Sequence, residues 1–294
     1  MRMHRIMGQA GTRSSRRLVV AVALMGLAAL GMASSAMAAP KGAFAVFAQC
    51  PVHAAEVDAC LYSPTTSGYI KLGKQEVPIV KTQVLQGGLL ENEPSYVKPL
   101  SAALNGETLT KTAQKVPGGL LGLVECNKIS NFIERVLCEG FFENGVTGVN
   151  AVTELAAPAS SVVLNSAYEQ LGVGTALTLP IKVHLENPLL GGECYIGSTK
   201  EPIKLELTTG ATSGGPTGKP GTQTTKEGGK ILVISGVSLV GNTFTAPKAT
   251  GCGVLGILDG ILNEKIGLPS TKNTAVLNGS VEIANSGAVE ESEG

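Results

Sequence analysis

Six cysteines constrain the fold of this chain more than any other feature, and all of them follow an N-terminal export signal. They are Cys50, Cys60, Cys126, Cys138, Cys194 and Cys252. An even number of cysteines in an exported chain is typical of a disulfide framework. We therefore predict three disulfides and no free thiol.

Pairing in sequence order is the simplest connectivity: Cys50–Cys60, Cys126–Cys138 and Cys194–Cys252. The middle pair meets an objection, because apolar residues recur at helical spacing between positions 129 and 137. A helix rises about 1.5 Å per residue, so a helix filling this interval would separate its ends beyond the ~7 Å that a disulfide spans. The middle pair requires a short helix; otherwise Cys60–Cys126 with Cys50–Cys138 is the alternative. A metal site is disfavoured, because no C-x-x-C spacing occurs.

The first 38 residues have the pattern of a secretory signal peptide. A basic segment without acids comes first, and residues 18–32 form an apolar run that is too short to span a membrane comfortably. Ala36-Met37-Ala38 matches a small-x-small cleavage site. We expect residues 1–38 to be removed and the product to be secreted, without an integral membrane span.

The charge of the remaining chain argues against nucleic-acid binding. All 23 acidic residues lie after position 38, whereas five of the 23 basic residues lie before it, so the mature chain has a net charge of −5. Its sole arginine is Arg135. Proteins that bind nucleic acids or phosphates normally cluster arginine and lysine, because the phosphate charge dominates such binding.

The composition and local patterns favour a mainly β fold. The chain contains 38 glycines and only 16% charged residues, which is typical of a turn-rich β protein. Ile203, Leu205 and Leu207 alternate with Lys204 and Glu206, as in a half-buried strand that follows Cys194. We predict a β-sandwich-like fold stapled by disulfides.

Several motifs of the first half recur in the second half in the same order. Residues 104–110 and 239–245 share the pattern Leu-x-Gly-x-Thr-x-Thr, and the Gly-Leu-Leu-Gly-Leu of residues 119–123 resembles the Gly-Val-Leu-Gly-Ile of residues 253–257. This order indicates an internal duplication. The alternative is that two β-rich stretches merely share turn residues.

We therefore predict two pseudo-repeated β-rich halves, residues 39–158 and 159–294, each with one short helix. The second helix should end at Gly267, because glycine commonly follows the last helical residue. Residues 208–230 contain no Leu, Ile, Val or Phe and are rich in Gly, Thr, Pro and Lys. They predict a flexible loop that forms a long excursion within a hairpin.

The mature chain contains only two histidines and two aspartates. His53, Glu56 and Asp58 lie between Cys50 and Cys60, where a minor metal site is one hypothesis. A small solvated disulfide loop explains them better. His184 shares the polar face of a predicted strand with Lys182, which indicates a surface histidine.

Motifs of enzyme active sites are also missing from the sequence. Asp259 precedes a glycine in a pattern typical of a turn or helix start. No G-x-S-x-G sequence and no glycine-rich phosphate loop occur. We therefore predict no enzyme, no catalytic residues, no metal site and no cofactor. The alternative is a secreted hydrolase that uses a pair of glutamates brought together in space.

Several cysteine- and proline-containing motifs resemble those of a group of exported actinobacterial proteins. These are Cys50-Pro51, Cys60-Leu61-Tyr62-Ser63, Cys194-Tyr195-Ile196-Gly197-Ser198 and Gly267-Leu268-Pro269-Ser270. The resemblance covers most of the mature chain and implies an extracytoplasmic, disulfide-containing β protein. It implies no functional residues.

We therefore expect a non-enzymatic extracellular or envelope-associated protein with a binding or scaffolding role. The neutral strand faces, the scarcity of catalytic motifs and the flexible loop rich in Gly and Thr motivate this hypothesis, and the sequence identifies no ligand. A weaker alternative is a surface or pore protein that associates with itself through apolar strands.

Overall fold

The computed structural model describes residues 38–123, 130–133, 135–136 and 147–294. Residues Ala38–Gly294 make up one compact unit. Residues 1–37 of the predicted signal segment, Cys126 and Cys138 lie outside the described residues, as does part of the helix predicted near residues 130–137. The third disulfide and the extent of that helix therefore stay predictions.

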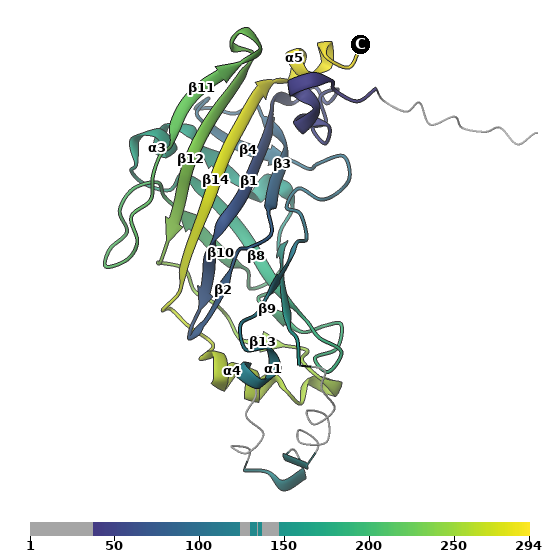
Figure 1. The fold of residues 1–294 in the computed structure, drawn as a ribbon, viewed down its shortest axis with the longest axis vertical. Coiled ribbons are helices and arrows are strands. Elements are labelled where there is room, and N and C mark those ends of the chain that lie inside the picture. Colours follow the sequence, from purple (N-terminus) through teal and green to yellow (C-terminus); the bar gives the residue numbers. More distant parts are fainter. Residues whose placement is uncertain (1–37, 124–129, 134, 137–146) are drawn as a thin grey trace, which may run out of the picture. The chain divides into compact units, whose positions relative to one another are not determined.

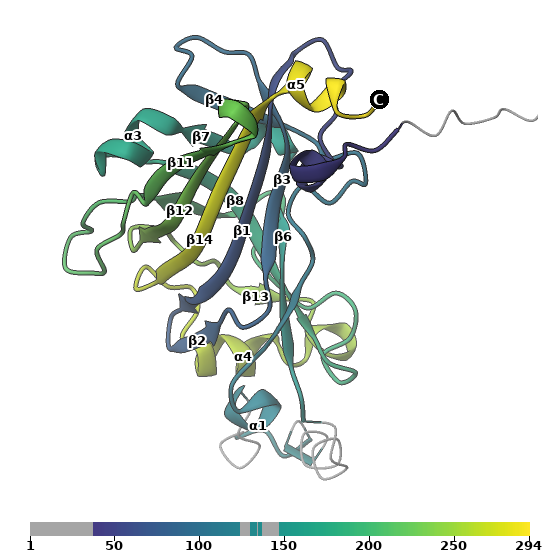
Figure 2. The ribbon, with the colours of Figure 1, turned by 45° about the horizontal axis from the view of Figure 1, so that its top comes forward.

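The longest strands form one antiparallel layer (Figures 1 and 2). Its order is β11 (Thr222–Lys226), β12 (Ile231–Gly241), β14 (Thr274–Asn285), β1 (Val57–Leu72), β3 (Gln83–Leu90) and β4 (Val97–Ser101). The short strand β2 (Gln75–Pro78) pairs with β1 in a hairpin. Because proline has no N–H to donate, Pro78 suits this edge position.

A second antiparallel layer is built around β8 (Leu177–Glu186). Its other members are β4, β7 (Val163–Asn165), β6 (Asn150–Leu155), β5 (Ala113–Lys115), β10 (Ile203–Leu207), β9 (Tyr195–Ile196) and β13 (Ala249–Thr250). The two layers are joined on both sides. Strand β4 pairs with β3 and with β7, and Thr208 and Val240 exchange two backbone hydrogen bonds of 2.8 Å where β10 meets β12. The mainly β, sandwich-like fold predicted from the sequence is confirmed.

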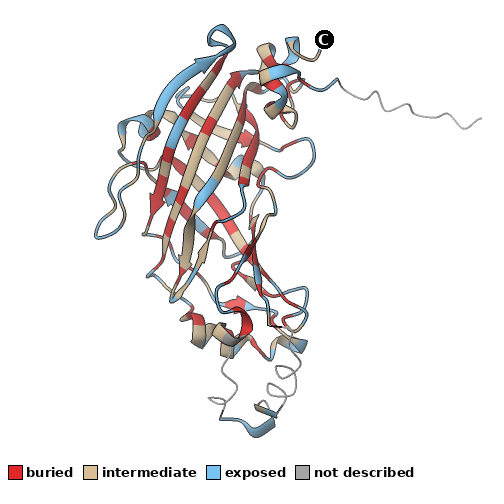
Figure 3. Cartoon of the chain, viewed as in Figure 1, coloured by how far each residue is buried: buried red, intermediate tan, exposed pale blue. Residues whose placement is uncertain are grey.

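The main core fills the space between the two layers. In β10, Ile203, Leu205 and Leu207 are fully buried while the alternate residues are exposed, as the sequence predicts (Figure 3). Burying each such side chain contributes about 1.5–3 kcal/mol. A smaller cluster around the Cys50–Cys60 disulfide contains Phe44 and Phe47.

Short helices occupy the connections between strands. They are η1 (Gly42–Phe47), α1 (Gly119–Leu123), η3 (Ala159–Ser161), α3 (Ser166–Leu171), η4 (Glu227–Gly229), η5 (Val254–Gly256), α4 (Asp259–Ile266) and α5 (Ser286–Glu291). Helix α4 ends at Gly267, which has the left-handed conformation predicted for it. None of the helices in the described residues combines the length and the apolar character needed to cross a bilayer.

Two disulfides of the predicted set are present, Cys50–Cys60 and Cys194–Cys252. Both follow the predicted sequential pairing. The first closes the loop at the start of β1, and the second joins the segment before β9 to the segment after β13.

One strand contains two glycines, and one local prediction needs correction. Gly87 and Gly88 lie inside β3, although glycine usually weakens the interior of a strand. A side chain at Gly87 would come within 2.4 Å of the Ser101 carbonyl, so glycine is needed there because β4 lies so close. The segment 208–230 contains more regular structure than the predicted loop, since Thr222–Lys226 form β11 against β12. Threonine favours strands, and an exposed edge strand needs no apolar residues.

The structure does not confirm the internal duplication. Residues 239–245 begin in β12, whereas residues 104–110 form a turn and an isolated bridge. Strands from residues 39–158 and from residues 159–294 alternate within the sheet order, with β14 pairing with β1. The two halves therefore do not form separate sheets.

Candidate interaction loop

An exposed apolar loop precedes helix α4. We call residues 253–258 the apolar loop. Val254 is 69% exposed, Leu255 is 98% exposed and Ile257 is 41% exposed. Scattered single apolar residues are normal on a protein surface, but several in one short loop are typical of an interaction site.

Leu255 also adopts a backbone conformation that is unfavourable for leucine. Its φ of 55° and ψ of 24° lie in the left-handed region, which costs about 1–2 kcal/mol for a residue with a side chain. Gly253 and Gly256 on either side also have positive φ. A side chain at Gly253 would come within 2.8 Å of Leu258, so the turn can form only with glycine there. The turn therefore holds an exposed leucine at an energetic cost.

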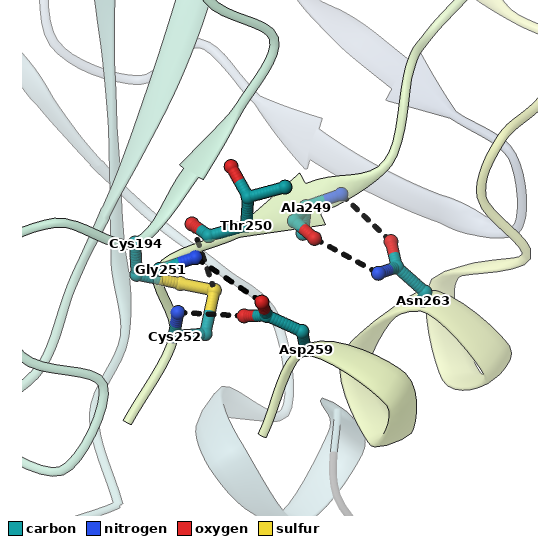
Figure 4. The surroundings of a disulfide bond; sticks show 7 residues. All are labelled: Cys194, Ala249, Thr250, Gly251, Cys252, Asp259 and Asn263. Atoms are coloured by element: carbon teal, nitrogen blue, oxygen red, sulfur yellow. Dashed lines mark hydrogen bonds between the residues drawn. A yellow bond between two sulfur atoms is a disulfide. The ribbon is translucent and has the colours of Figure 1, made fainter. Parts of the chain in front are cut away.

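Covalent and polar contacts fix the start of this loop (Figure 4). Cys252 forms the disulfide with Cys194, and its N–H donates to Asp259 Oδ1 at 2.7 Å. The Gly251 N–H donates to Asp259 Oδ2 at 3.3 Å. Asp259 was predicted to serve turn or helix-start chemistry, and the structure confirms this role.

Helix α4 holds the strand before the loop through a second side chain. Asn263 Oδ1 accepts from the Ala249 N–H at 2.7 Å, and Asn263 Nδ2 donates to the Ala249 carbonyl at 2.9 Å (Figure 4). The Gly253 N–H donates to the Leu190 carbonyl at 2.7 Å. The apolar side chains are therefore presented by a framework that is already ordered.

Three exposed lysines flank the helix that follows the loop. Lys248 lies near α4 because the next residue, Ala249, is hydrogen-bonded to Asn263 of that helix. Lys74 lies at the other end of α4, where its N–H donates to the Ile266 carbonyl at 2.7 Å. Lys272 precedes Asn273, whose Oδ1 accepts from the Gly73 N–H at 2.9 Å. Within the described residues, none of these three lysines forms an ion pair. This end of the protein thus combines apolar side chains with unpaired positive charge.

The predicted site residues of the first disulfide loop do not converge on one point. His53 lies between two carboxylates of the C-terminal segment, with Nδ1 3.2 Å from Glu290 Oε1 and Nε2 3.2 Å from Glu293 Oε2. Asp58 pairs instead with Lys98, and Glu56 is exposed. His53 therefore ties the disulfide loop to α5. No group of three metal-ligand side chains occurs among the residues that the structure places.

His184 is more enclosed than a plain surface histidine. Its ring stacks on Tyr195 with centroids 4.5 Å apart, and its Nε2 is buried without a hydrogen bond. Lys182 Nζ lies 4.2 Å from the centroid of the Tyr195 ring and 3.2 Å from the Glu154 carboxylate. Burial, with a smaller contribution from Glu154, raises the pKa of Tyr195. Most of these side chains pair with one another across three strands, which is how cross-strand pairs stabilise a sheet.

One carboxyl group has a strongly shifted pKa. Glu169 on α3 is 3% exposed, and both of its carboxylate oxygens are buried without a hydrogen bond. Burial raises its pKa from 4.5 to about 7. A catalytic glutamate pair would add repulsion from a second carboxylate, whereas burial alone accounts for this shift.

No protein-family profile, characterised protein or solved structure matches this chain. Sequence reasoning missed the apolar loop, because the pattern Gly-Val-Leu-Gly-Ile carries no sign of whether its leucine is buried. The positive φ at Leu255 has no signature in the sequence.

Proposed function

We propose that this protein is an exported, non-enzymatic binding protein that attaches to a lipid surface of the cell envelope through the apolar loop. The observation that carries the proposal is Leu255, which is held almost fully exposed in a strained conformation by an ordered framework. Strain that the surrounding structure maintains is a common feature of functional sites.

A lipid surface suits this loop better than a pocket on a protein partner. The loop leaves Leu255 98% exposed, and a lipid interface accepts such a side chain without a matching shape. Lys74, Lys248 and Lys272 around α4 can approach anionic headgroups, and each lysine near such a surface contributes about 1 kcal/mol.

The size of the effect is sufficient for reversible attachment. Inserting the exposed parts of Val254, Leu255 and Ile257 would contribute about 4 kcal/mol in total. Together with the lysines this corresponds to binding at micromolar to millimolar lipid. Two weak signals of this kind are typical of peripheral membrane association.

Co-sedimentation with vesicles tests the proposal. The disulfide-bonded mature chain should bind vesicles of phosphatidylcholine with phosphatidylglycerol more strongly than vesicles of phosphatidylcholine alone, and high salt should weaken the difference. Leu255→Asn should lower the affinity about 10-fold or more. The matched control is Leu104→Asn, since Leu104 is 52% exposed beside Gln49, at the Cys50–Cys60 disulfide.

Two results would overturn the proposal. One is wild-type protein that stays in the supernatant at millimolar lipid. The other is Leu255→Asn and Leu104→Asn variants that bind equally well. A change in elution volume on size exclusion with Leu255→Asn, without any vesicle binding by the wild type, would instead assign the loop to self-association.

A further inference from the structure

Two small cavities lie next to each other between the two layers of the sandwich. One has a volume of about 40 Å³ and the other of about 30 Å³. Ile70, Gln83 and Thr153 line both cavities. The two therefore meet at these three side chains and form one interrupted space.

The walls of this space are apolar and uncharged. Most of the lining side chains are Leu, Ile and Val from both layers, and Ile266 of α4 lines the first cavity. None of the described residues that line either cavity is charged. An ionised ligand would lose its hydration there without gaining an opposite charge, so the space excludes ions.

Two polar side chains lie where the cavities meet. Thr153 is only 8% exposed and lines both cavities, as does Gln83. Gln83 Nε2 donates weakly to the Thr110 carbonyl at 3.4 Å. The nearby Gln114 differs, because it accepts from the Val80 and Lys81 N–H groups and donates to the Lys81 carbonyl at 2.7 Å. Thr153 and Gln83 thus keep hydrogen-bonding capacity inside an apolar wall.

We propose that this space binds an uncharged, mainly apolar molecule that carries one hydroxyl group. Its apolar part would lie against the Leu, Ile and Val side chains, and its hydroxyl would bond to Thr153 and Gln83. Mostly apolar pockets with a few polar groups that fix the orientation are the usual form of small-molecule sites. A hydrogen bond to Thr153 or Gln83 would offset the cost of removing the ligand hydroxyl from water.

The volumes limit the ligand in the closed form to a short chain. An apolar cavity of about 150 Å³ is needed to hold benzene, so a longer molecule must move the walls apart. The structure offers one place for this movement, the hairpin of β1 and β2, which contributes the half-buried Ile70 and Val77. Strand β2 pairs with β1. Because it is an edge strand, it can shift without breaking a second ladder.

Titration with three eight-carbon probes tests this proposal independently of vesicle binding. We expect 1-octanol to shift the NMR signals of residues around Thr153 and to bind about 3- to 10-fold more tightly than n-octane, because it gains one hydrogen bond. Octanoate should bind more weakly than either. Equal binding of octanol and octane would refute the role of Thr153 and Gln83.

Two variants separate the polar and the apolar contributions. Thr153→Val keeps the shape of the side chain and should reduce octanol affinity to that of octane, while octane affinity stays unchanged. Ala151→Leu should fill the first cavity and reduce the affinity for both probes. Thr225→Val on exposed β11 is the matched control and should change neither.

The proposal stays testable even if Ala151→Leu fails to fold, because Thr153→Val is nearly isosteric and keeps the packing of the core. Octanol that binds the wild type and Thr153→Val equally would overturn the proposal. So would an absence of signal shifts at saturating octanol. If either octanol result is obtained but the wild-type protein still binds vesicles, the proposed function of the apolar loop stands.

Discussion

Replacing Glu169 with glutamine should remove most of the dependence of stability on pH between 4.5 and 7. Glu169 is 3% exposed, its carboxylate oxygens have no hydrogen-bond partner, and burial raises its pKa to about 7. Glutamine has nearly the same shape but does not ionise. The variant therefore isolates the energetic effect of the buried charge.

The sign of the effect follows from the two pKa values. Below pH 4.5 the carboxyl group is protonated in both the folded and the unfolded chain, so it contributes no pH dependence. As the pH rises from 4.5 towards 7, the unfolded chain loses this proton while the folded chain keeps it. Stability therefore falls across this range and becomes constant above it.

The size of the loss is about 3 kcal/mol, since each pKa unit corresponds to about 1.4 kcal/mol. This figure is an upper bound. Helix α3 (Ser166–Leu171) is short, and its detachment would let the carboxylate reach water without unfolding the whole chain. The helix is held by the Asn165 side chain, which accepts from the Tyr168 N–H at 3.0 Å, and by the Thr209 hydroxyl, which donates to the Glu169 carbonyl.

Urea denaturation of the disulfide-bonded chain at pH 5, 6.5 and 8 measures this effect. Wild type should lose about 2–3 kcal/mol between pH 5 and pH 8 from this group, and Glu169→Gln should not. Glu264→Gln, at an exposed position of α4, is the matched control and should follow the wild type. Parallel profiles for wild type and Glu169→Gln would refute the assignment of the shifted pKa to Glu169.

Two further substitutions test the framework of the apolar loop. Removing the Cys194–Cys252 disulfide with paired alanines should lower the free energy of unfolding by about 4 kcal/mol, against about 3 kcal/mol for Cys50–Cys60, because the first closes a loop of 58 residues and the second a loop of 10. Urea denaturation would detect the difference, and equal losses would contradict the loop-length argument. Asp259→Ala should cost about 2 kcal/mol through its two lost backbone hydrogen bonds and should expose residues 253–258 to limited proteolysis. An unchanged cleavage pattern would show that Asp259 does not order the loop.

Local signals in the sequence were sufficient for several elements. The alternation of Ile203, Leu205 and Leu207 predicted β10, because a strand buries every second side chain. Gly267 predicted the end of α4, because glycine readily adopts the left-handed conformation found there. Both disulfides among the described residues follow the sequential pairing.

Features that depend on distant neighbours could not be predicted in this way. The need for glycine at position 87 follows only from the neighbouring strand β4, whose Ser101 carbonyl lies too close for any side chain. The pairing of β14 with β1 joins Tyr69 with Val276, and no local pattern specifies such a partner. The position of Thr153 between two cavities becomes visible only when both layers enclose it.

The apolar loop shows this limit most clearly. Leu120 follows the first glycine of Gly-Leu-Leu-Gly-Leu, where its N–H donates to the Thr147 carbonyl, and it is fully buried. Val254 follows the first glycine of the related Gly-Val-Leu-Gly-Ile, at the corresponding position, and is 69% exposed. The two sequences have similar apolar content, so the difference comes from the framework of Cys252 and Asp259 that holds the second turn.

This contrast makes one variant decisive for the function of the loop. If Leu255 served stability, replacing it would lower the free energy of unfolding. In the structure Leu255 buries almost no surface and occupies a left-handed conformation that asparagine tolerates better. Leu255→Asn should therefore raise the free energy of unfolding by up to about 1 kcal/mol while it weakens vesicle binding. Replacing a purely structural leucine would instead lower the free energy of unfolding. A higher free energy of unfolding together with weaker vesicle binding would therefore identify Leu255 as a binding residue.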